Sequence, residues 1–466
     1  MTLDTSSGAP PRTVQNLDPA TGQLIESLRC ASADEVRASV DRARAAQPGW
    51  AATPIEERAA ALARFGKALG AHADEMGALV TREMGKTLRT AVGEAKGYAA
   101  GIEVETQEVI EALRPVDYEA KAQRVQTVYE PLGVVAAITP WNFPVGMPLS
   151  ILTPALMAGN SVVFKPSEHT PLTGRRMAEL LAAELPEGVL QLVEGDGATG
   201  AALVDAEVDM VGFVGSRATG QAIMKAAAGS LKRLVLELGG KDPMVVFEDA
   251  DLEAAAKSAT EHSLRNTGQV CCSVERVYVA ESIADAFEEK VVEIARSWEH
   301  GDGRVDGVKM GPLVSEEQRR KVAEQVERAR AEGAVVRLGG ELPEGPGWFY
   351  PATVLTGVEQ SNSITHAETF GPVVAVTRFS GDEAEGIRLA NDTVYGLGAN
   401  VWTRDPERGA RVAKALKAGQ VGVNRYLGGA PGTPWVGARQ SGFGYLGGPD
   451  GHRQFTVPKT ISVAGA

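Results

Sequence analysis

Cysteine is scarce in this sequence. Only three of the 466 residues are cysteines, and two of them, Cys271 and Cys272, are adjacent. A small scaffold held together by disulfides is excluded, because such folds carry more cysteines in far shorter chains. So few thiols are typical of a reducing compartment, and we expect a cytoplasmic protein.

Clusters of positive charge are missing as well. The 47 lysines and arginines are outnumbered by 60 aspartates and glutamates, which gives a formal charge of −13, and no basic run is longer than residues 319–321. A chain of this charge repels phosphate backbones, so nucleic acid is not expected as a partner.

Charge of either sign is absent between Glu130 and Lys165, a span long enough to cross a bilayer. Prolines at positions 140, 144, 148 and 154 argue against a membrane helix, because they would leave backbone groups unpaired in lipid. We expect a buried strand, a loop and a buried helix there, and no membrane partner. The polar segment 1–16 predicts a loose start rather than a signal peptide.

What the chain does contain is an alternation of short apolar runs and longer helical stretches. This pattern is typical of parallel strands joined by helical crossovers, and the length of 466 residues predicts two large α/β domains. The first group of strands is expected at 133–138, 161–165, 189–193, 208–214, 234–238 and 244–247. The second group, with a charged helix at 316–332, is expected at 274–280, 334–338, 371–379, 399–402 and 420–423.

Two alternating segments, 118–129 and 454–463, fit neither group of strands. They predict either an oligomerisation arm or a simple edge hairpin. Near the start of the chain, Ser32 and Glu35 fit a capping box, and segment 53–56 also fits one, with Pro54 at the first helical position.

One glycine-rich segment matches the dinucleotide fingerprint literally. Gly195, Gly197 and Gly200 form G-x-G-x-x-G after a strand and before a helix. The fingerprint also needs an acidic residue about 20 positions later, and no aspartate or glutamate lies between Asp209 and Glu237. This gap makes a direct contact with pyrophosphate less favoured at these glycines.

A second glycine turn offers another anion site. Gly215 allows close approach, and Ser216 can cap the next helix, whose N-terminus favours negative charge. Lys165 ends a strand and Glu168 follows three residues later, where a carboxylate and an ammonium can bind ribose hydroxyls. A solvated ion pair is the ordinary alternative for these two residues.

The adjacent cysteines allow several interpretations. A metal site is disfavoured because no cysteine or histidine lies at ligand spacing, His262 being the nearest, and a vicinal disulfide is disfavoured in a reducing cell. A buried inert cysteine remains an alternative. However, the polar turn 266–269 before the pair and the strand after it would present a thiol at an element junction, where a neighbouring base or dipole can activate it.

Two further side chains are candidates to act with such a thiol. Glu237 ends an apolar strand before two glycines, where burial would raise the pKa of a carboxylate and suit it as a base, although a solvated glutamate is the common case. Asn142 lies in a proline-bracketed turn, 139–144, and its amide can donate to an oxyanion. Thiol, carboxylate, amide and nucleotide crevice together predict one reaction.

Eight motifs resemble those of the aldehyde dehydrogenase superfamily. They are PWNFP (140–144), KPSE (165–168), FVGS (213–216), ELGGK (237–241), GQVC (268–271), ETFGP (368–372), YGLGANVWTRD (395–405) and VN (423–424). The resemblance implies two wound parallel-sheet α/β domains, for nucleotide binding (1–114 and 132–238) and catalysis (239–432). It also implies a small β oligomerisation arm (115–131 and 450–466) and assembly as a homodimer or homotetramer.

The resemblance implies roles for single residues as well. Cys271 would be the nucleophile, Asn142 the oxyanion donor and Glu237 the base that releases the acid. Phe143, Arg265 and Trp435 would contact substrate, although Phe143 and Trp435 are also compatible with plain core. Cofactor contacts are implied for Trp141, Lys165, Glu168, Gly197, Gly215, Ser216, Leu238, Glu368 and Phe370, with Gly197 near the adenine rather than the pyrophosphate.

The implied activity is the oxidation of a small aldehyde to the carboxylic acid with NAD(P)+, through a thiohemiacetal and a thioester on Cys271. The presence of Glu237 favours hydrolysis over transfer to coenzyme A. Glu168 favours NAD because it would repel a 2′-phosphate, with NADP as the alternative.

The substrate is left open between two classes. Segment 273–279 resembles lactaldehyde-type enzymes, whereas Arg265 resembles a carboxylate-binding arginine of succinate-semialdehyde enzymes, whose second arginine is replaced here by Ser150. The C-terminal motif at 434–445 also departs from the usual PFGG-x-K-x-SG-x-GRE, which affects the substrate mouth.

Two other classes of function stay open. One is a catalytically silent structural or binding relative of the same fold, and the other is a thiol amidase or acyltransferase that needs no cofactor. Iodoacetamide reactivity of Cys271 and binding of NAD separate these alternatives. We further hypothesise that Cys272 modulates the oxidation of Cys271.

Overall fold

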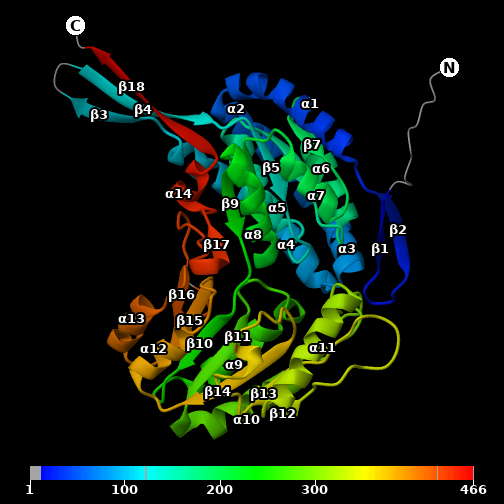
Figure 1. The fold of residues 1–466 in the computed structure, drawn as a ribbon, viewed down its shortest axis with the longest axis vertical. Coiled ribbons are helices and arrows are strands. Elements are labelled where there is room, and N and C mark those ends of the chain that lie inside the picture. The colour runs from blue at the N-terminus through cyan, green and yellow to red at the C-terminus, as the bar shows by residue number, and fades with distance from the viewer. Residues whose placement is uncertain (1–11, 121–122, 428, 465–466) are drawn as a thin grey trace.

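The computed structural model describes residues 12–120, 123–427 and 429–464. A six-stranded sheet with the order β17-β9-β8-β5-β6-β7 forms the upper body in Figure 1. All pairs in it are parallel except β17 with β9. Its strands are β5 (Val134–Ile138), β6 (Ser161–Lys165), β7 (Leu190–Leu192), β8 (Met210–Val214), β9 (Arg233–Glu237) and β17 (Gly442–Phe443).

Helices cover both faces of this sheet because its strands are apolar on both sides. Every residue of β5 is buried, and alternate residues join different hydrophobic clusters: Val135 and Ala137 one, Val134 and Ala136 the other. The first cluster is completed by α2 (Ile55–Ala71), α3 (Ala73–Met84), α4 (Leu88–Ala112), α5 (Gly146–Met157) and α6 (Pro171–Ala182). The second is completed by α1 (Ala33–Ala52), α7 (Gly197–Asp205) and α8 (Arg217–Ala227).

A seven-stranded sheet with the order β12-β13-β14-β11-β10-β15-β16 forms the lower body. Only β12 and β13 pair antiparallel. Its strands are β10 (Asp242–Val246), β11 (Val274–Ala280), β12 (Val335–Leu338), β13 (Thr353–Thr356), β14 (Val373–Phe379), β15 (Gly398–Trp402) and β16 (Gln420–Val423). Its helices are α9 (Leu252–Leu264), α10 (Ala284–Arg296), α11 (Glu316–Ala331), α12 (Glu383–Asn391) and α13 (Pro406–Ala415).

The predicted α/β class with two wound sheets is confirmed. The predicted strands are all present, with ends that differ by at most two residues, and the predicted helix at 316–332 is α11. The grouping is wrong for 244–247, because this strand is β10 and pairs with β11 and β15 of the lower sheet. The chain crosses from the upper to the lower sheet between Glu237 and Asp242, so the two bodies meet where the glycines of ELGGK lie.

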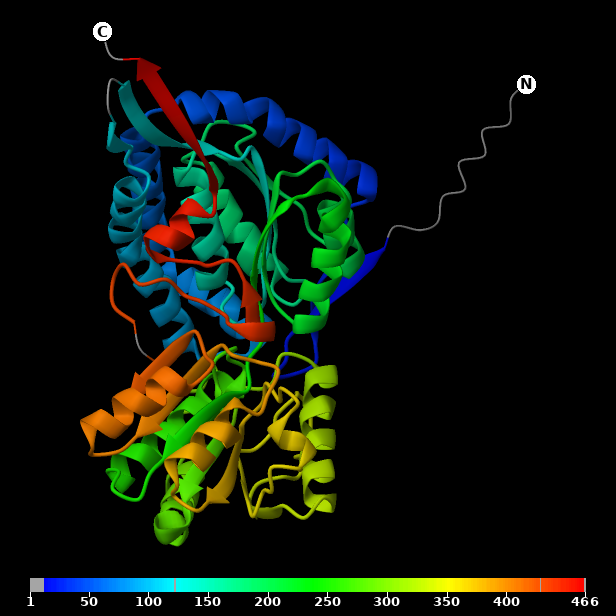
Figure 2. The ribbon, with the colours of Figure 1, turned by 60° about the vertical axis from the view of Figure 1, so that its left-hand side comes forward.

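A third, three-stranded sheet stands away from both bodies. It has the order β18-β4-β3, and Figures 1 and 2 show it projecting at the end of the molecule that carries the C-terminus. Its strands are β3 (Val116–Ala120), β4 (Gln123–Pro131) and β18 (Thr456–Ala464), and α14 (Gly448–Arg453) leads into it. The strand character predicted for 118–129 and 454–463 is thus confirmed, with two strands in the first segment.

The N-terminal region corrects two predictions. Thr13 already belongs to β1 (Thr13–Leu17), which pairs with β2 (Leu24–Arg29), so a loose start is wrong for the described part of 1–16, while residues 1–11 lie outside the described residues. The capping box of Ser32 and Glu35 is confirmed. The box predicted at 53–56 is wrong, because Thr53 caps the C-terminus of α1, its hydroxyl donates back to the Gly49 carbonyl (3.2 Å), and α2 has no side-chain cap.

The charge-free segment folds as expected into a buried strand, a loop and a buried helix, namely β5, residues 139–145 and α5. Within the described ranges, every helix is too short or too polar to span a bilayer.

Candidate active site

A cavity of about 890 Å³ opens at the carboxyl ends of β5, β6 and β8, with α11 of the lower body as its opposite wall. This size suits a cofactor or a large ligand. Open parallel sheets bind ligands at this edge, because the loops that follow the strands diverge there. The predicted residues Trp141, Lys165, Glu168, Gly197, Gly215 and Ser216 all line the cavity.

Lys165 and Glu168 lie together at one end of the cavity. The Lys165 ammonium is buried, donates to the Pro166 carbonyl (3.1 Å), and lies 3.6 Å from the half-exposed Glu168 carboxylate. Burial lowers the pKa of Lys165, and the charge of Glu168 opposes this shift. An ammonium has three donors, so this pair still has polar capacity for a hydroxylated ligand.

The N-termini of α7 and α8 both lie near the cavity, but they differ. On α7, the cap Asp196 accepts from the amides of Ala198 and Thr199 and forms an ion pair with Arg12 (2.5 Å), so the chain's own carboxylate already occupies that helix end. The segment that matches G-x-G-x-x-G therefore contains the N-cap of α7. The acidic residue that the dinucleotide fingerprint requires about 20 positions later is missing, which also disfavours a pyrophosphate site at these glycines. Gly197 follows Asp196, and the space around its Cβ position is open.

At α8, the Ser216 hydroxyl caps the helix by accepting from the Thr219 amide (3.2 Å), and no acidic residue lies in the first turn. A Cβ on Gly215 would lie 2.4 Å from the Phe213 ring, so a larger residue would require that ring to move. The dipole of α8 is thus available to an anion.

Aromatic rings gather around Trp141, which lines the cavity. Trp141 meets Phe370 edge to face with ring centroids 5.5 Å apart, and His169 at 6.2 Å. Thr139 also lines the cavity, and its buried hydroxyl has no hydrogen-bond partner in residues 12–120, 123–427 and 429–464. A buried ammonium, an uncompensated helix N-terminus and an orphaned hydroxyl in one elongated space fit a dinucleotide.

Cys271 lies in a turn just before β11, after a strained loop. Asn266, Thr267 and Gly268 have φ of 53°, 58° and 70°, so three consecutive residues adopt the left-handed region, which is rare for a threonine. Side-chain bonds hold this loop: Thr267 donates to the Gly311 carbonyl (3.0 Å), and Gln269 accepts from the Val314 amide (2.9 Å).

The Cys271 thiol is partly exposed and packs with Phe143, Tyr426 and Trp435 around a small apolar cluster. Its contact with Cys272 raises the pKa of Cys271 well above its ordinary value, and burial adds to the shift. The same contact lowers the pKa of Cys272, and the Tyr426 hydroxyl, 3.1 Å from its sulfur, contributes. The two thiols therefore titrate as a pair, and the second proton is held strongly.

Glu237 and Asn142 approach this turn from the upper body. Glu237, at the end of β9, is 5% exposed, and neither of its carboxylate oxygens has a hydrogen-bond partner among the described residues. Burial raises its pKa well above the ordinary value, and the nearby Trp435 indole offsets this only in part. The buried Asn142 amide donates to the Gln269 carbonyl (3.1 Å), two residues before Cys271. An amide nitrogen has two hydrogens, so one remains for a ligand.

A second cavity, of about 720 Å³, lies on the other side of the strained loop. Arg265 and Asn266 line it, and the Asn266 amide also donates to the Asn142 carbonyl (3.2 Å). Among the described residues, neither Arg265 nor the neighbouring Arg89 takes part in an ion pair, although both line this cavity.

Leu238 and Glu368, also predicted as cofactor contacts, lie between the two bodies. Leu238 is buried and packs against Gly220 of α8. The Glu368 carboxylate accepts from the Gly240 amide (3.1 Å), and burial together with the charge of Glu275 raises its pKa to about 7.

Sequence reasoning missed three polar side chains near the thiols. Tyr426 donates to the Cys272 carbonyl and stacks on His262 with ring centroids 3.7 Å apart. Asp242 is 2% exposed, and neither of its carboxylate oxygens has a partner within the described segments, whereas Glu275 forms a buried ion pair. The only sequence signals were a carboxylate inside an apolar strand and a tyrosine two residues after the VN motif.

Comparison with known proteins agrees with this geometry. The model of the aldehyde dehydrogenase family matches residues 5–461. The chain is 38% identical to an aldehyde dehydrogenase of Paenarthrobacter nicotinovorans, over 96% of this chain and 99% of that one. It is 40% identical to the 3,6-anhydro-alpha-L-galactose dehydrogenase of Streptomyces coelicolor, over 99% and 94%.

A solved structure shares the whole fold. Lactaldehyde dehydrogenase from Escherichia coli superposes with a TM-score of 0.94 at 34% identity, over 98% of this chain and 96% of that one. The chain therefore belongs to the aldehyde dehydrogenase family and is an NAD(P)-dependent oxidoreductase of aldehydes.

Proposed function

We propose that the enzyme oxidises a small aldehyde to the free carboxylic acid, with Cys271 as nucleophile, Asn142 as oxyanion donor and Glu237 as base. One observation carries this proposal: three groups from separate segments surround one turn, namely a thiol, a buried carboxylate with no hydrogen-bond partner among the described residues, and an amide with one N–H still free.

In this mechanism the Cys271 sulfur, once deprotonated, bonds to the aldehyde carbon. The Asn142 amide and the Cys271 backbone amide stabilise the resulting oxyanion. Bound NAD(P)+ supplies the hydride acceptor. A thioester remains on Cys271, and Glu237, whose raised pKa suits it as a base, takes a proton from water. The water oxygen bonds to the acyl carbon, the C–S bond breaks, and the thiolate is restored.

For the cofactor, we propose NAD with NADP as an alternative. Lys165 and Glu168 would hold the adenosine ribose, and Gly215 and Ser216 the pyrophosphate. Trp141, Gly197, Leu238, Glu368 and Phe370 would complete the site. One similar solved protein, PnpE, is in complex with nicotinamide adenine dinucleotide, whereas a similar enzyme of Sinorhizobium fredii is named as NADP-dependent. If Glu168 disfavours a 2′-phosphate, Glu168→Gln should raise kcat/KM with NADP relative to NAD.

For the substrate, we propose a small aldehyde that carries a carboxylate, with Phe143 and Trp435 lining its path. Arg265 and Arg89 have no ion-pair partner among the described residues, yet the chain as a whole carries a charge of −13. A positive cavity beside Asn142 would attract an anionic aldehyde. Relatives named as succinate-semialdehyde dehydrogenases support this class, whereas the lactaldehyde dehydrogenase likeness supports a short neutral one.

We also propose the division into domains at 1–114 with 132–238, 239–432, and an arm at 115–131 with 450–466. The arm would join copies into a homodimer or homotetramer in the cytoplasm. The apolar side chains of Val457, Ile461 and Val463 on β18 are exposed in the single chain. This exposure supports the proposal that another copy covers the sheet in the oligomer. The three cysteines are free, as expected in a reducing compartment.

An assay at 340 nm tests the activity with succinic semialdehyde and butanal, with each cofactor. We expect NAD+ reduction with both and higher kcat/KM for the anionic aldehyde. Arg265→Ala should remove this preference, and Arg265→Lys should restore part of it. A silent relative would reduce no cofactor with any aldehyde, and a cofactor-independent acyltransferase would fail to bind NAD+ in a fluorescence titration.

A further inference from the structure

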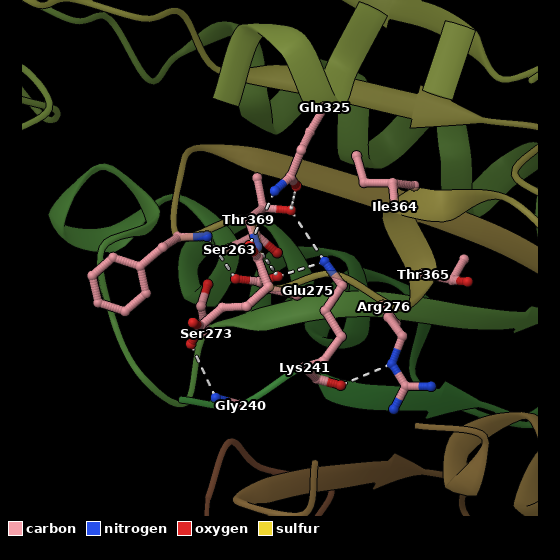
Figure 3. A network of polar contacts seen from close by, with 12 residues as sticks. Gly240, Lys241, Ser263, Ser273, Glu275, Arg276, Gln325, Ile364, Thr365 and Thr369 are labelled. Carbon is pink, nitrogen blue, oxygen red and sulfur yellow. Dashed lines mark hydrogen bonds and ion pairs between the residues drawn. The ribbon is translucent and has the colours of Figure 1, made fainter. Parts of the chain in front are cut away.

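A buried ion pair joins the strand that follows Cys271 to the segment that follows Glu237, and both of its members also bind the loop 368–370. Lys241 and Glu275 are 1% and 4% exposed, and the Lys241 ammonium lies 2.5 Å from the Glu275 carboxylate. Figure 3 shows this pair between Thr369 and Gly240. Glu275 is four residues after Cys271 on β11, and Lys241 is four residues after Glu237, so the pair joins the segments that carry the proposed nucleophile and base.

The Glu275 carboxylate also accepts two backbone hydrogen bonds from that loop. The amide of Thr369 donates to one oxygen (2.8 Å) and the amide of Phe370 to the other (2.9 Å). Both oxygens of this buried carboxylate therefore accept hydrogen bonds from the backbone amides of two adjacent residues. Lys241 adds a bond to the Thr369 hydroxyl (3.1 Å), which in turn donates to Gln325 of α11 (2.9 Å).

Phe370 needs this support because its backbone is strained. Its φ is 54°, in the left-handed region, which is unfavourable for a bulky side chain. Such a conformation persists only when its surroundings hold it from several sides. Here Glu275 binds the amides, and Gln318 of α11 donates to the carbonyls of Thr369 (3.1 Å) and Phe370 (2.9 Å).

The strained turn lies where the thiol and the nucleotide cavity meet. The Phe370 ring contacts Trp141, which lines the cavity. Next to Phe370, Gly371 packs on Gly268 of the loop before Cys271 so closely that a Cβ on Gly268 would lie 2.0 Å from the Gly371 carbonyl oxygen. A bound hydride acceptor would have to approach the carbon bound to Cys271, and the turn at Thr369 and Phe370 would help to hold it there.

We propose that Glu275 is a positioning residue: it holds the turn at Thr369 and Phe370 in its left-handed form and so sets the distance between the nicotinamide and Cys271. This inference rests on the proposed function. Glu275 itself touches neither the aldehyde nor the cofactor. Its effect should therefore appear in hydride transfer and not in acylation of the thiol or hydrolysis of the thioester.

The test separates these steps with two substrates. An activated ester such as p-nitrophenyl acetate acylates Cys271 and is hydrolysed with no hydride transfer and no cofactor. For Glu275→Gln we expect ester hydrolysis within about twofold of the unaltered enzyme. Single-turnover reduction of NAD+ should be slower by about a hundredfold, the cost of a misplacement near 1 Å. Aldehyde deuterated at the carbonyl carbon should then give a larger isotope effect on kcat.

The matched control is Glu288→Gln, because Glu288 is also a buried glutamate of the lower body (2% exposed), paired there with Arg378. Any effect of Glu288→Gln should slow ester hydrolysis and hydride transfer by the same factor. Equal losses of both activities in Glu275→Gln, or no loss of hydride transfer, would overturn the positioning role.

Two further measurements keep the test decisive. Glu275→Gln leaves Lys241 without its counter-charge and could therefore fail to fold. The double variant Lys241→Met/Glu275→Gln and the single variant Gln318→Met loosen the same turn without an unpaired charge. In both we expect slower hydride transfer and nearly unchanged ester hydrolysis. NAD+ affinity, read from tryptophan fluorescence, should fall in these variants. Failure of the unaltered enzyme to reduce NAD(P)+ with any aldehyde would instead refute the proposed function.

Discussion

The two sides of the active site treat their polar groups differently. On the nucleotide side, Asp196 and Lys165 already have partners within the chain. On the thiol side, the carboxylates of Glu237 and Asp242 are buried and have no hydrogen-bond partner in the part of the chain that the structure describes. The pKa of each is raised well above its ordinary value because burial disfavours the charge. The nucleotide side is therefore built to bind, whereas the thiol side keeps groups that can exchange protons.

Loss of the nucleophile is the largest expected effect. Cys271→Ala should lower aldehyde oxidation by at least about ten-thousandfold, because the covalent step is lost and the adjacent Cys272 is buried (6% exposed). NAD+ should still bind with a Kd within about twofold, since Cys271 does not line the nucleotide cavity. Spectrophotometric rates and a fluorescence titration check both parts, and loss of NAD+ binding would show that the two sides are not independent.

Glu237→Gln should come next, because it alters the thiol side at one step only. We expect turnover to fall by about 10²–10⁴, the range for a general base, while the first turnover persists. Stopped-flow measurement should show a burst of NADH near one per site, and mass spectrometry should show the acylated Cys271. A linear time course without a burst would mean that Glu237 acts before the thioester forms.

On the nucleotide side, Lys165→Met should weaken binding and leave the chemistry alone. Loss of a hydrogen bond from a buried charge should raise KM for NAD+ by about ten- to hundredfold, with kcat changed by less than about threefold. Lys225→Met, on the exposed face of α8 and outside the cavity, is the matched control. A fall in kcat equal to the rise in KM would contradict the separation of the two sides.

The smallest expected effect concerns the thiol pair. A thiol with a raised pKa is neutral at pH 7, and only the thiolate is alkylated, so iodoacetamide should modify Cys271 faster as pH rises. Cys272→Ala removes the leading cause of the shift and should move this profile to lower pH, with severalfold faster alkylation at pH 7. Lower intrinsic nucleophilicity of the more acidic thiolate will offset part of the gain. An unmoved profile would show that burial alone controls Cys271.

Strand positions and the nucleotide side were predictable because both depend on local pattern. The apolar runs of β5, β6 and β11 are bounded by glycine, proline or charged residues, so the ends of these strands can be predicted from the sequence. Lys165, Glu168 and Ser216 follow strand ends directly, and parallel strands bring their carboxyl ends to one edge.

The thiol side was less predictable because it depends on contacts between distant segments. Nothing in the sequence signals that Glu275 accepts amides from residues 94 and 95 positions later. Thr267 and Phe370 have left-handed backbone conformations, which threonine and phenylalanine rarely adopt. Hydrogen bonds from distant segments hold the two residues in these conformations. The short hairpin of β1 and β2 and the strand β13 were missed because their apolar pattern is weak.

The pairing of β18 with β4 has a consequence for biosynthesis. Residues 456–464 complete a sheet whose other strands leave the ribosome more than 300 residues earlier, as the register of Thr456 with Pro131 shows. During translation β4 therefore has an unpaired edge until β18 has been synthesised. The upper sheet likewise lacks its edge strand β17 until late in synthesis. Such long-range closure slows folding and leaves a nascent chain prone to mispairing, so yield should depend strongly on chaperones and on an intact C-terminus.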